Sequence, residues 1–106
     1  MWCINRYYKF CLYSYSDEPS IIYLSEVEVF KKYRKKGYGN ILLKHAKILA
    51  KERRYKIMYL KVIKNSWQEN WYKRNGFEFF ENDKFTNNVY CWLKYNINKN
   101  QIKYEN

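Results

Sequence analysis

Two glycines separated by one residue, Gly37 and Gly39, stand between an apolar extended run that ends at Val29 and a long amphipathic helix pattern. Glycines at such a corner let backbone N–H groups approach a bound anion, and the N-terminus of the new helix adds partial positive charge. The feature restricts the chain to folds in which a strand leads through a tight loop into a helix. The 106 residues suffice for one such domain but not for two.

Hydrophobic periodicity predicts the elements around this loop. Apolar residues recur at helical spacing from Gly39 to about Arg53, and lysines such as Lys47 fall largely on the opposite face. Ser66 and Glu69 form a capping box, in which the Ser66 hydroxyl accepts from the N–H of residue 69 while the Glu69 carboxylate reaches back. The predicted order is strand, strand, helix, strand, helix, strand, strand, with one or two strands in the first segment: residues 4–15, 21–29, 39–53, 57–62, 66–75, 77–80 and 89–95.

The same sequence excludes several functional classes. The loop has no third glycine at the dinucleotide-binding spacing, the next strand ends without an acidic residue, and no Gly-Lys-Ser/Thr follows as in a P-loop. The three cysteines show no C-x-x-C spacing, so we expect neither a disulfide framework nor a zinc site, and no other metal site is indicated. No apolar run approaches the ~18 residues of a membrane span, so the sequence predicts a soluble, cytoplasmic protein without membrane partners.

The positive charge is concentrated on one part of the chain. The net charge is +11, and residues 31–74 hold fifteen Lys/Arg against Glu52 and Glu69, a net of +13, whereas the remaining residues carry −2. A polyphosphate ligand would be drawn to such a block, and so would nucleic acid or an acidic protein surface. The alternative is that the lysines reflect an AT-rich coding composition and have no partner.

A second block of residues follows the glycine loop at a characteristic distance. Asn65 stands shortly after the predicted internal strand, Tyr72 follows seven residues later, and Gly76-Phe77 closes the segment. In order and spacing, residues 23–77 resemble the GCN5-related N-acetyltransferase family. The acetyl-CoA loop motif of that family, Gln/Arg-x-x-Gly-x-Gly/Ala, is matched by residues 34–39, and its second motif is matched by the Asn65 block.

The resemblance implies a mixed α/β fold. We expect a mostly antiparallel central sheet with a V-shaped splay and two helices. Most members begin with a strand and two helices, whereas only twenty residues precede the strand predicted over residues 21–29, so we expect that N-terminal part to be lacking. The predicted domain is residues 1–95, followed by a polar tail over residues 96–106.

The resemblance also implies acetyl-CoA as the cosubstrate. In the family, main-chain N–H groups of the glycine loop hold the pyrophosphate of coenzyme A, and the arm of the cofactor pairs with the strand before the loop. Charged side chains of the loop could add attraction to the phosphates. The expected cofactor-binding residues are Val27, Val29, Arg34, Lys35, Lys36, Gly37, Tyr38, Gly39, Asn40 and Asn65.

The implied activity is direct acetyl transfer to an amine, without an acyl-enzyme. Tyr72 matches the general acid that protonates the departing sulfur, with simple packing as its alternative role. Glu26 and Glu28 stand two apart on a strand, hence on the same face, and are the candidate bases; exposed ion pairs with lysines are the alternative. The backbone N–H at or beside Val29 would polarise the thioester carbonyl. Some relatives take the base from the next strand, where this chain has Leu60.

The sequence leaves the acceptor open. A small-molecule amine and an amine of a peptide or protein are both compatible with the residues present. The short N-terminal part would leave the acceptor site open, or a second subunit would complete it as a homodimer through the aromatic N-terminal strand. A basic nucleic-acid-binding module and a catalytically silent CoA-binding protein are the functional alternatives. The single histidine, His45, falls mid-helix and is expected at the surface or the edge of the core.

Overall fold

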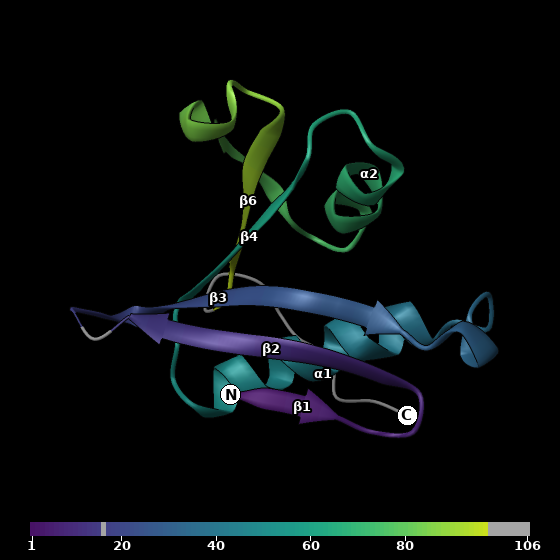
Figure 1. The fold of residues 1–106 in the computed structure, drawn as a ribbon. Coiled ribbons are helices and arrows are strands. Elements are labelled where there is room, and N and C mark those ends of the chain that lie inside the picture. Colours follow the sequence, from purple (N-terminus) through teal and green to yellow (C-terminus); the bar gives the residue numbers. More distant parts are fainter. Residues whose placement is uncertain (16, 98–106) are drawn as a thin grey trace.

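The computed structural model describes residues 1–15 and 17–97, which form one six-stranded sheet and two α-helices (Figure 1). The strands are β1 (Trp2–Ile4), β2 (Tyr8–Tyr15), β3 (Glu18–Val29), β4 (Ile57–Ile63), β5 (Glu78–Asn82) and β6 (Tyr90–Asn96). The helices are α1 (Tyr38–Glu52) and α2 (Trp67–Arg74), with 3-10 turns η1 (Lys31–Tyr33) and η2 (Lys84–Thr86). The order across the sheet is β1-β2-β3-β4-β6-β5, and the predicted mixed α/β class is confirmed.

The centre of the sheet opens into a V. Strands β3 and β4 run parallel and pair only over residues 21–23 and 57–59, whereas all other strand pairs among the described residues are antiparallel. Beyond this short ladder the two strands diverge, as Figure 1 shows. One arm carries β1, β2, β3 and α1, and the other carries β4, β5, β6 and α2. The predicted splay is therefore present, and it leaves one edge of β3 without a strand partner from Leu24 to Val29.

A β-bulge interrupts β3 at Glu26. Lys9 pairs with Glu28 and Cys11 pairs with Ser25, so two residues of β3 lie opposite one residue of β2. Glu26 adopts the left-handed conformation with φ +54°. Such an extra residue bends the strand and increases its twist, and here it occurs where β3 leaves β4.

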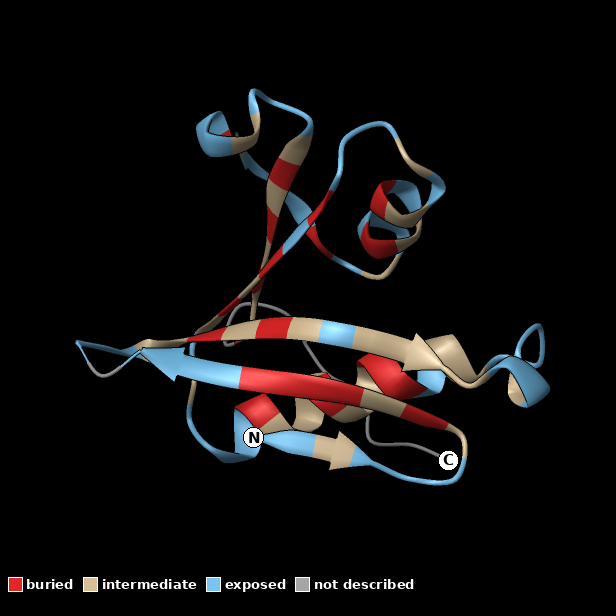
Figure 2. Ribbon diagram, viewed as in Figure 1, coloured by how far each residue is buried: buried red, intermediate tan, exposed pale blue. Residues whose placement is uncertain are grey.

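The core lies between α1 and the sheet. The buried residues Leu42, Leu43, Ala46 and Ala50 of α1 repeat at helical spacing. They join the alternate buried residues of β2 and β3 in one cluster, which Figure 2 shows in red along both strands. Helix α2 contacts β4 and β5 and buries Tyr72 in the same cluster. One continuous core therefore holds both arms of the V.

The prediction for Lys47 was wrong. Its side chain is partly buried rather than on the solvent face, and its Nζ atom donates to the carbonyl of Asn75 at the end of α2. The ammonium lies 4.2 Å from the ring centroid of Tyr95 and 5.5 Å from that of Phe77. Helical periodicity placed Lys47 opposite the sheet-facing residues of α1, but the end of α2 and β6 cover it from another direction.

The capping box of α2 differs from its prediction in one partner. The Ser66 hydroxyl accepts from the N–H of Glu69 at 3.2 Å, as expected. The Glu69 carboxylate accepts from the N–H of Asn65 at 2.6 Å, one residue before the expected one. Asn65 has φ +63°, a left-handed conformation that asparagine tolerates well, and this turn brings its N–H to the carboxylate.

The described part of the chain ends in ordered, buried structure. Strand β6 extends to Asn96 and Ile97 is fully buried, whereas residues 98–106 of the predicted tail lie outside the described residues. Within the described residues, neither helix is long and apolar enough to cross a bilayer.

Candidate active site

The corner between β3 and α1 presents a row of free backbone donors. Within the described part of the chain, no hydrogen bond involves the N–H groups of residues 35–40. Lys35 and Gly37 both have positive φ, +62° and +87°, and Gly37 is the N-cap of α1. Left-handed residues in a turn gather successive N–H groups into a concavity that suits an anion, and the first N–H groups of a helix have no intrahelical acceptor. The corner thus has the backbone geometry that suits an anion.

An aromatic cluster braces this corner. Tyr38, the first residue of α1, stacks on Tyr7 with ring centroids 4.4 Å apart, and Tyr33 packs edge-on against both rings at 4.8 and 5.8 Å. Arg6 donates to the Tyr33 hydroxyl at 3.3 Å. The side chain of Tyr38 is therefore engaged in packing, which leaves its backbone N–H as the group it can offer to a ligand.

The two loop glycines are required for different structural reasons. A Cβ on Gly37 would meet nothing within 4 Å, so its glycine is required by the positive φ. A Cβ on Gly39 would lie 3.0 Å from Cζ2 of Trp71, so that glycine allows α2 to approach α1. The Trp71 indole N–H also donates to Asn40 Oδ1 at 3.1 Å. Only Gly37 therefore serves the loop conformation itself.

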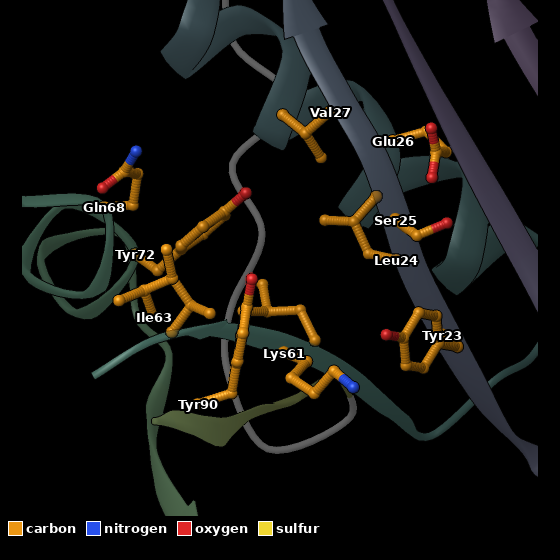
Figure 3. A pocket seen from close by; sticks show the side chains of 12 residues that line it. Tyr23, Leu24, Ser25, Glu26, Val27, Lys61, Ile63, Gln68, Tyr72 and Tyr90 are labelled. Carbon is orange, nitrogen blue, oxygen red and sulfur yellow. The ribbon is translucent and has the colours of Figure 1, made fainter. Parts of the chain in front are cut away.

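A cavity of about 360 Å³ occupies the V next to this corner. Its walls come from β3, β4, α2 and the start of β6 (Figure 3). In Figure 3, Val27 and Leu24 point from β3 toward Tyr72, whereas Glu26 lies on the other side of that strand. The cavity thus extends through the gap between the strands, from the α2 side to the opposite face of the sheet.

Tyr72 projects into this cavity from α2. Its ring is held by Trp71 at 4.9 Å and by Phe77 at 5.5 Å. Burial raises the pKa of Tyr72 to about 12. No hydrogen bond engages its hydroxyl within the described residues, and Figure 3 shows the hydroxyl directed into the cavity. Tyr72 is thus a neutral donor at physiological pH, aimed at the space between the arms.

The free edge of β3 faces the same space. The N–H of Phe30 donates to the carbonyl of Tyr7, the residue just before β2. Because successive backbone groups of a strand point to opposite edges, the N–H and C=O groups of Val27 and Val29 point away from β2. The Val29 carbonyl accepts from Arg34 Nε at 2.8 Å, which is consistent with this direction. Backbone donors at Val27 and Val29 are therefore available to a ligand in the V.

The two candidate bases lie in different surroundings. Glu28 lies 3.6 Å from Lys9 Nζ and 3.5 Å from Arg34 Nη2, and its side chain is not part of the cavity wall. Glu26 is exposed and is the one acidic residue among the described residues that line the cavity. Of the two, Glu26 is the one that can meet a molecule bound in the V.

The remaining predicted residues surround the corner. Lys35, Lys36 and Asn40 are exposed, and so is Arg34 despite its contacts with β3. The side chain of Asn65 is exposed at the end of β4 and does not line the cavity. The backbone N–H of Asn65 donates to the Glu69 carboxylate. A contact between Asn65 and the cofactor stays a prediction.

Several lining residues were not among the sequence predictions. They are Tyr23, Leu24, Ser25, Leu60, Lys61, Val62, Ile63, Gln68 and Tyr90. The Ser25 hydroxyl is buried without a partner in the described structure, and Lys61 Nζ lies 3.5 Å from the buried Asp83 carboxylate. The alternation of residues along β3 places Tyr23 and Ser25 on the same face of the strand. The sequence does not show how β3 is aligned with β4 and β6, so it could not predict that these two residues share a cavity with residues of those strands.

Other reactive side chains lie away from the cavity. His45 is at the edge of the core, as predicted, where its Nδ1 lies 2.8 Å from the Tyr8 hydroxyl and burial lowers its pKa. The three cysteines are free. No group of three or more His, Cys, Asp or Glu within residues 1–15 and 17–97 could hold a metal ion.

A family model described as an acetyltransferase (GNAT) domain matches residues 2–79. No curated protein sequence matches the chain.

Solved structures with the same fold include three acetyltransferases. A GNAT family acetyltransferase from Elizabethkingia anophelis with acetyl-CoA bound has a TM-score of 0.70 at 21% identity, covering 85% of this chain and 68% of that one. A Bacillus subtilis acetyltransferase in complex with CoA has a TM-score of 0.73 at 18% identity, with the same two coverages of 85% and 68%. The PaiA N-acetyltransferase from Thermoplasma acidophilum in complex with coenzyme A has a TM-score of 0.70 at 20% identity, covering 85% and 53%.

Proposed function

Because this chain belongs to the GNAT family of acetyltransferases, whose domain model matches residues 2–79, we propose that it transfers the acetyl group of acetyl-CoA to an amine. The observation that carries the proposal is the pairing of a corner rich in free N–H donors with a cavity into which a neutral tyrosine hydroxyl projects. Three similar structures hold acetyl-CoA or CoA, which supports this cosubstrate.

The residues of the corner fit coenzyme A. The free N–H groups of residues 35–40 can donate to its pyrophosphate, and the exposed Lys35 and Lys36 add positive charge beside it. Val27 and Val29 offer backbone groups at the free edge of β3, along which the extended arm of the cofactor would run. We assign a further cofactor contact to Asn65 on the strength of its motif alone.

Acetyl-CoA supplies a thioester, whose carbonyl carbon forms a bond to the amine nitrogen while its bond to sulfur breaks. The Val29 N–H donates to the carbonyl oxygen as negative charge develops there. Glu26 takes the proton that the attacking nitrogen loses, because it is the acidic group of the cavity wall. The paired Glu28 instead holds Arg34 at the loop.

Tyr72 acts on the leaving group. Its pKa of about 12 lies above the ~8.5 of a free thiol, so complete proton transfer to the released thiolate is unfavourable. The hydroxyl therefore stabilises the departing thiolate by donating a hydrogen bond, and the thiolate takes its proton from solvent. In Figure 3 Tyr72 points into the cavity from α2, whereas Glu26 extends from β3 on the far side of that strand, so donor and base belong to different elements of the cavity wall.

The proposal is tested first by binding. CoA at about 100 times its Kd should raise the free energy of unfolding by ~2.7 kcal/mol, seen as a Tm increase of several degrees. Gly37→Glu, which places a carboxylate in the anion corner, should abolish the increase. Asn87→Glu is the matched control, because Asn87 is also left-handed and exposed but lies at the end of η2.

Product analysis separates the alternatives. Mass spectrometry of a panel of amines and lysine peptides incubated with acetyl-CoA should reveal at least one acetylated product. A CoA-dependent Tm increase with no acetylated product would indicate a catalytically silent CoA-binding protein. Salt-sensitive binding of oligonucleotides without any response to CoA would instead favour the nucleic-acid module.

A further inference from the structure

A second hollow lies beside the V, on the face of the sheet that points away from α1. Its volume is about 400 Å³. Five aromatic side chains form its walls: Tyr15, Tyr23, Tyr59, Phe80 and Trp92. They gather there because strand alternation sends the neighbouring residues, such as Leu24, Met58 and Leu93, into the core.

The rings form a connected surface rather than scattered contacts. Tyr23 meets Trp92 edge-on with centroids 5.5 Å apart, and Tyr59 meets Phe80 at 5.2 Å. Tyr23 and Tyr59 are register partners across β3 and β4, which places the two ring pairs on neighbouring strands. Phe80 remains 44% exposed and Tyr15 49%, so the surface is accessible from solvent.

The charge of this hollow is opposite to that of the chain. Asp17, Glu18 and Glu81 line it, whereas none of its described lining residues is Lys or Arg. In a chain with 21 basic and 10 acidic residues, this local excess of carboxylates is unexpected. Ring faces and carboxylates both attract a cation, and together they exclude a phosphate.

The protein's own ammonium groups already use these rings. Lys94 Nζ lies 5.4 Å from the centroid of Phe80, and Lys61 Nζ lies 5.6 Å from that of Trp92. Lys61 Nζ also lies 3.5 Å from the Asp83 carboxylate, which balances its positive charge. The aromatic wall therefore has the electronic character that binds an organic cation.

Tyr23 lines both this hollow and the cavity of the V. We propose that the aromatic hollow binds the second ammonium group of the acceptor, and that the acceptor is an aliphatic diamine or polyamine whose reacting amine enters the V beside Glu26. This proposal rests on the proposed acetyltransferase function. Three residues of β3 separate Tyr23 from Glu26, about 10 Å at ~3.3 Å per residue, which sets the spacing required between the two nitrogens.

Spacing gives the first test. Acetylation of diaminooctane, octylamine and ethylenediamine should be compared at fixed acetyl-CoA. The proposal expects kcat/KM for diaminooctane about tenfold above that for octylamine, mainly through KM, because only the diamine carries a cation to the hollow. Ethylenediamine should be poor, since its two nitrogens are too close. Equal kcat/KM for the two longer amines would overturn the proposal, and so would a stronger preference for a lysine peptide.

Variants of the hollow give the second test. Glu81→Gln and Trp92→Leu should each raise KM for diaminooctane several-fold and leave KM for octylamine unchanged. Glu52→Gln, which removes an exposed carboxylate at the end of α1, is the matched control and should change neither. Because Trp92 is half-buried, the exposed Glu81 keeps the test valid if Trp92→Leu fails to fold. An unchanged KM for diaminooctane in Glu81→Gln would count against the hollow.

Binding without turnover separates this proposal from the proposed function. Spermidine should bind the protein in calorimetry without acetyl-CoA, and Glu81→Gln should weaken that binding several-fold. If spermidine binds in this way but no amine is ever acetylated, the cation site stands and the acetyltransferase proposal fails. If amines are acetylated but spermidine binding is absent or indifferent to Glu81→Gln, the cation site fails and the acetyltransferase proposal stands.

Discussion

Tyr72 shows how one position combines packing with chemistry. Its ring belongs to the buried core cluster between Trp71 and Phe77, and its hydroxyl is left without a partner among the described residues. Burial keeps the pKa of Tyr72 far above neutral, so the hydroxyl stays protonated across the physiological range. The hydroxyl oxygen is not among the fully buried polar atoms of the described residues, so water in the cavity can satisfy it until a ligand supplies an acceptor. The departing sulfur would be that acceptor.

Tyr72→Phe should lower kcat by about 100-fold and leave the Kd of CoA within about twofold, because the removed donor acts only as the sulfur departs. Initial-rate kinetics and calorimetric titration with CoA measure the two quantities. Tyr90→Phe, which removes another hydroxyl from the same cavity wall, serves as the control and should retain most activity. A Tyr72→Phe variant with undiminished kcat would remove Tyr72 from the mechanism.

Lys47 is a residue whose role is structural and depends on pH. Burial lowers its pKa to about 8, against ~10.4 for a lysine in an unfolded chain. Between these values the unfolded chain binds more protons than the folded one, so the free energy of unfolding rises as pH increases from about 8 toward 10. Below pH 8 the cost of burying the ammonium is fully present.

Lys47→Met should remove this rise. In urea unfolding between pH 7 and about 10, the wild-type protein should gain a fraction of the ~1.4 kcal/mol per pH unit that one proton can contribute, reduced because the site is partly solvated. The variant should show a flatter profile over the same window. Lys64→Met, at an exposed position, should keep the wild-type slope. Identical slopes in wild type and Lys47→Met would show that Lys47 is not the titrating group.

At the level of elements, the meeting of α1 and α2 controls the glycine corner. Gly39 lies against the Trp71 ring, and Trp71 donates to Asn40 in the first turn of α1. The loop that presents the N–H groups is therefore positioned from two sides, by α2 through Trp71 and by the segment before β2 through the stacking of Tyr7 on Tyr38.

Gly39→Ala should destabilise the fold by about 1–3 kcal/mol, because its Cβ would overlap the Trp71 ring. In a protein that already carries Trp71→Leu, adding Gly39→Ala should cost less stability than it does in the wild-type protein. Chemical unfolding of the wild type, the two single variants and the double variant would measure this difference. Gly37→Ala gives the contrast, since its loss of about 1–2 kcal/mol comes from backbone strain and Trp71→Leu should not relieve it. Additive losses for Gly39→Ala and Trp71→Leu would show that the ring contact is not the cause.

The elements that the sequence predicted well are those specified locally. The apolar spacing in residues 39–53 and the capping box at Ser66 depend only on neighbours along the chain, and both helices start within one residue of prediction. The bulge at Glu26 and the cover over Lys47 arise from β2 and from the end of α2. Such contacts join distant segments, so periodicity could not reveal them.

At the scale of the molecule, two regions of opposite charge lie on different parts of the V. The anion corner is surrounded by exposed basic side chains of residues 31–36, whereas the aromatic hollow carries three carboxylates. Opposed fields of this kind would direct a polyanion and a polycation to different sides of the V. The sequence predicted the basic region, because its charges are consecutive, but not the acidic hollow, which collects residues from β3, β5 and the turn between β2 and β3.

Lys36→Glu should weaken CoA binding roughly five- to tenfold at low salt, because it reverses a charge in the anion corner. The effect should shrink as salt is raised, in titrations followed by calorimetry. Lys56→Glu makes the same change of charge at an exposed position before β4 and should alter the Kd much less. Equal effects of the two variants would mean that only net charge matters, not its location.

The three-residue ladder between β3 and β4 has one more consequence. Each arm of the V is made from an uninterrupted half of the chain, the first half ending with α1 and the second beginning with β4. The halves are joined by these few rungs, by the shared core, by the contacts between α1 and α2 and by a single connecting turn. The corner that would take the cofactor and the tyrosine that faces the cavity are thus encoded in separate continuous stretches of the chain, and a substitution where α1 meets α2 can alter both at once.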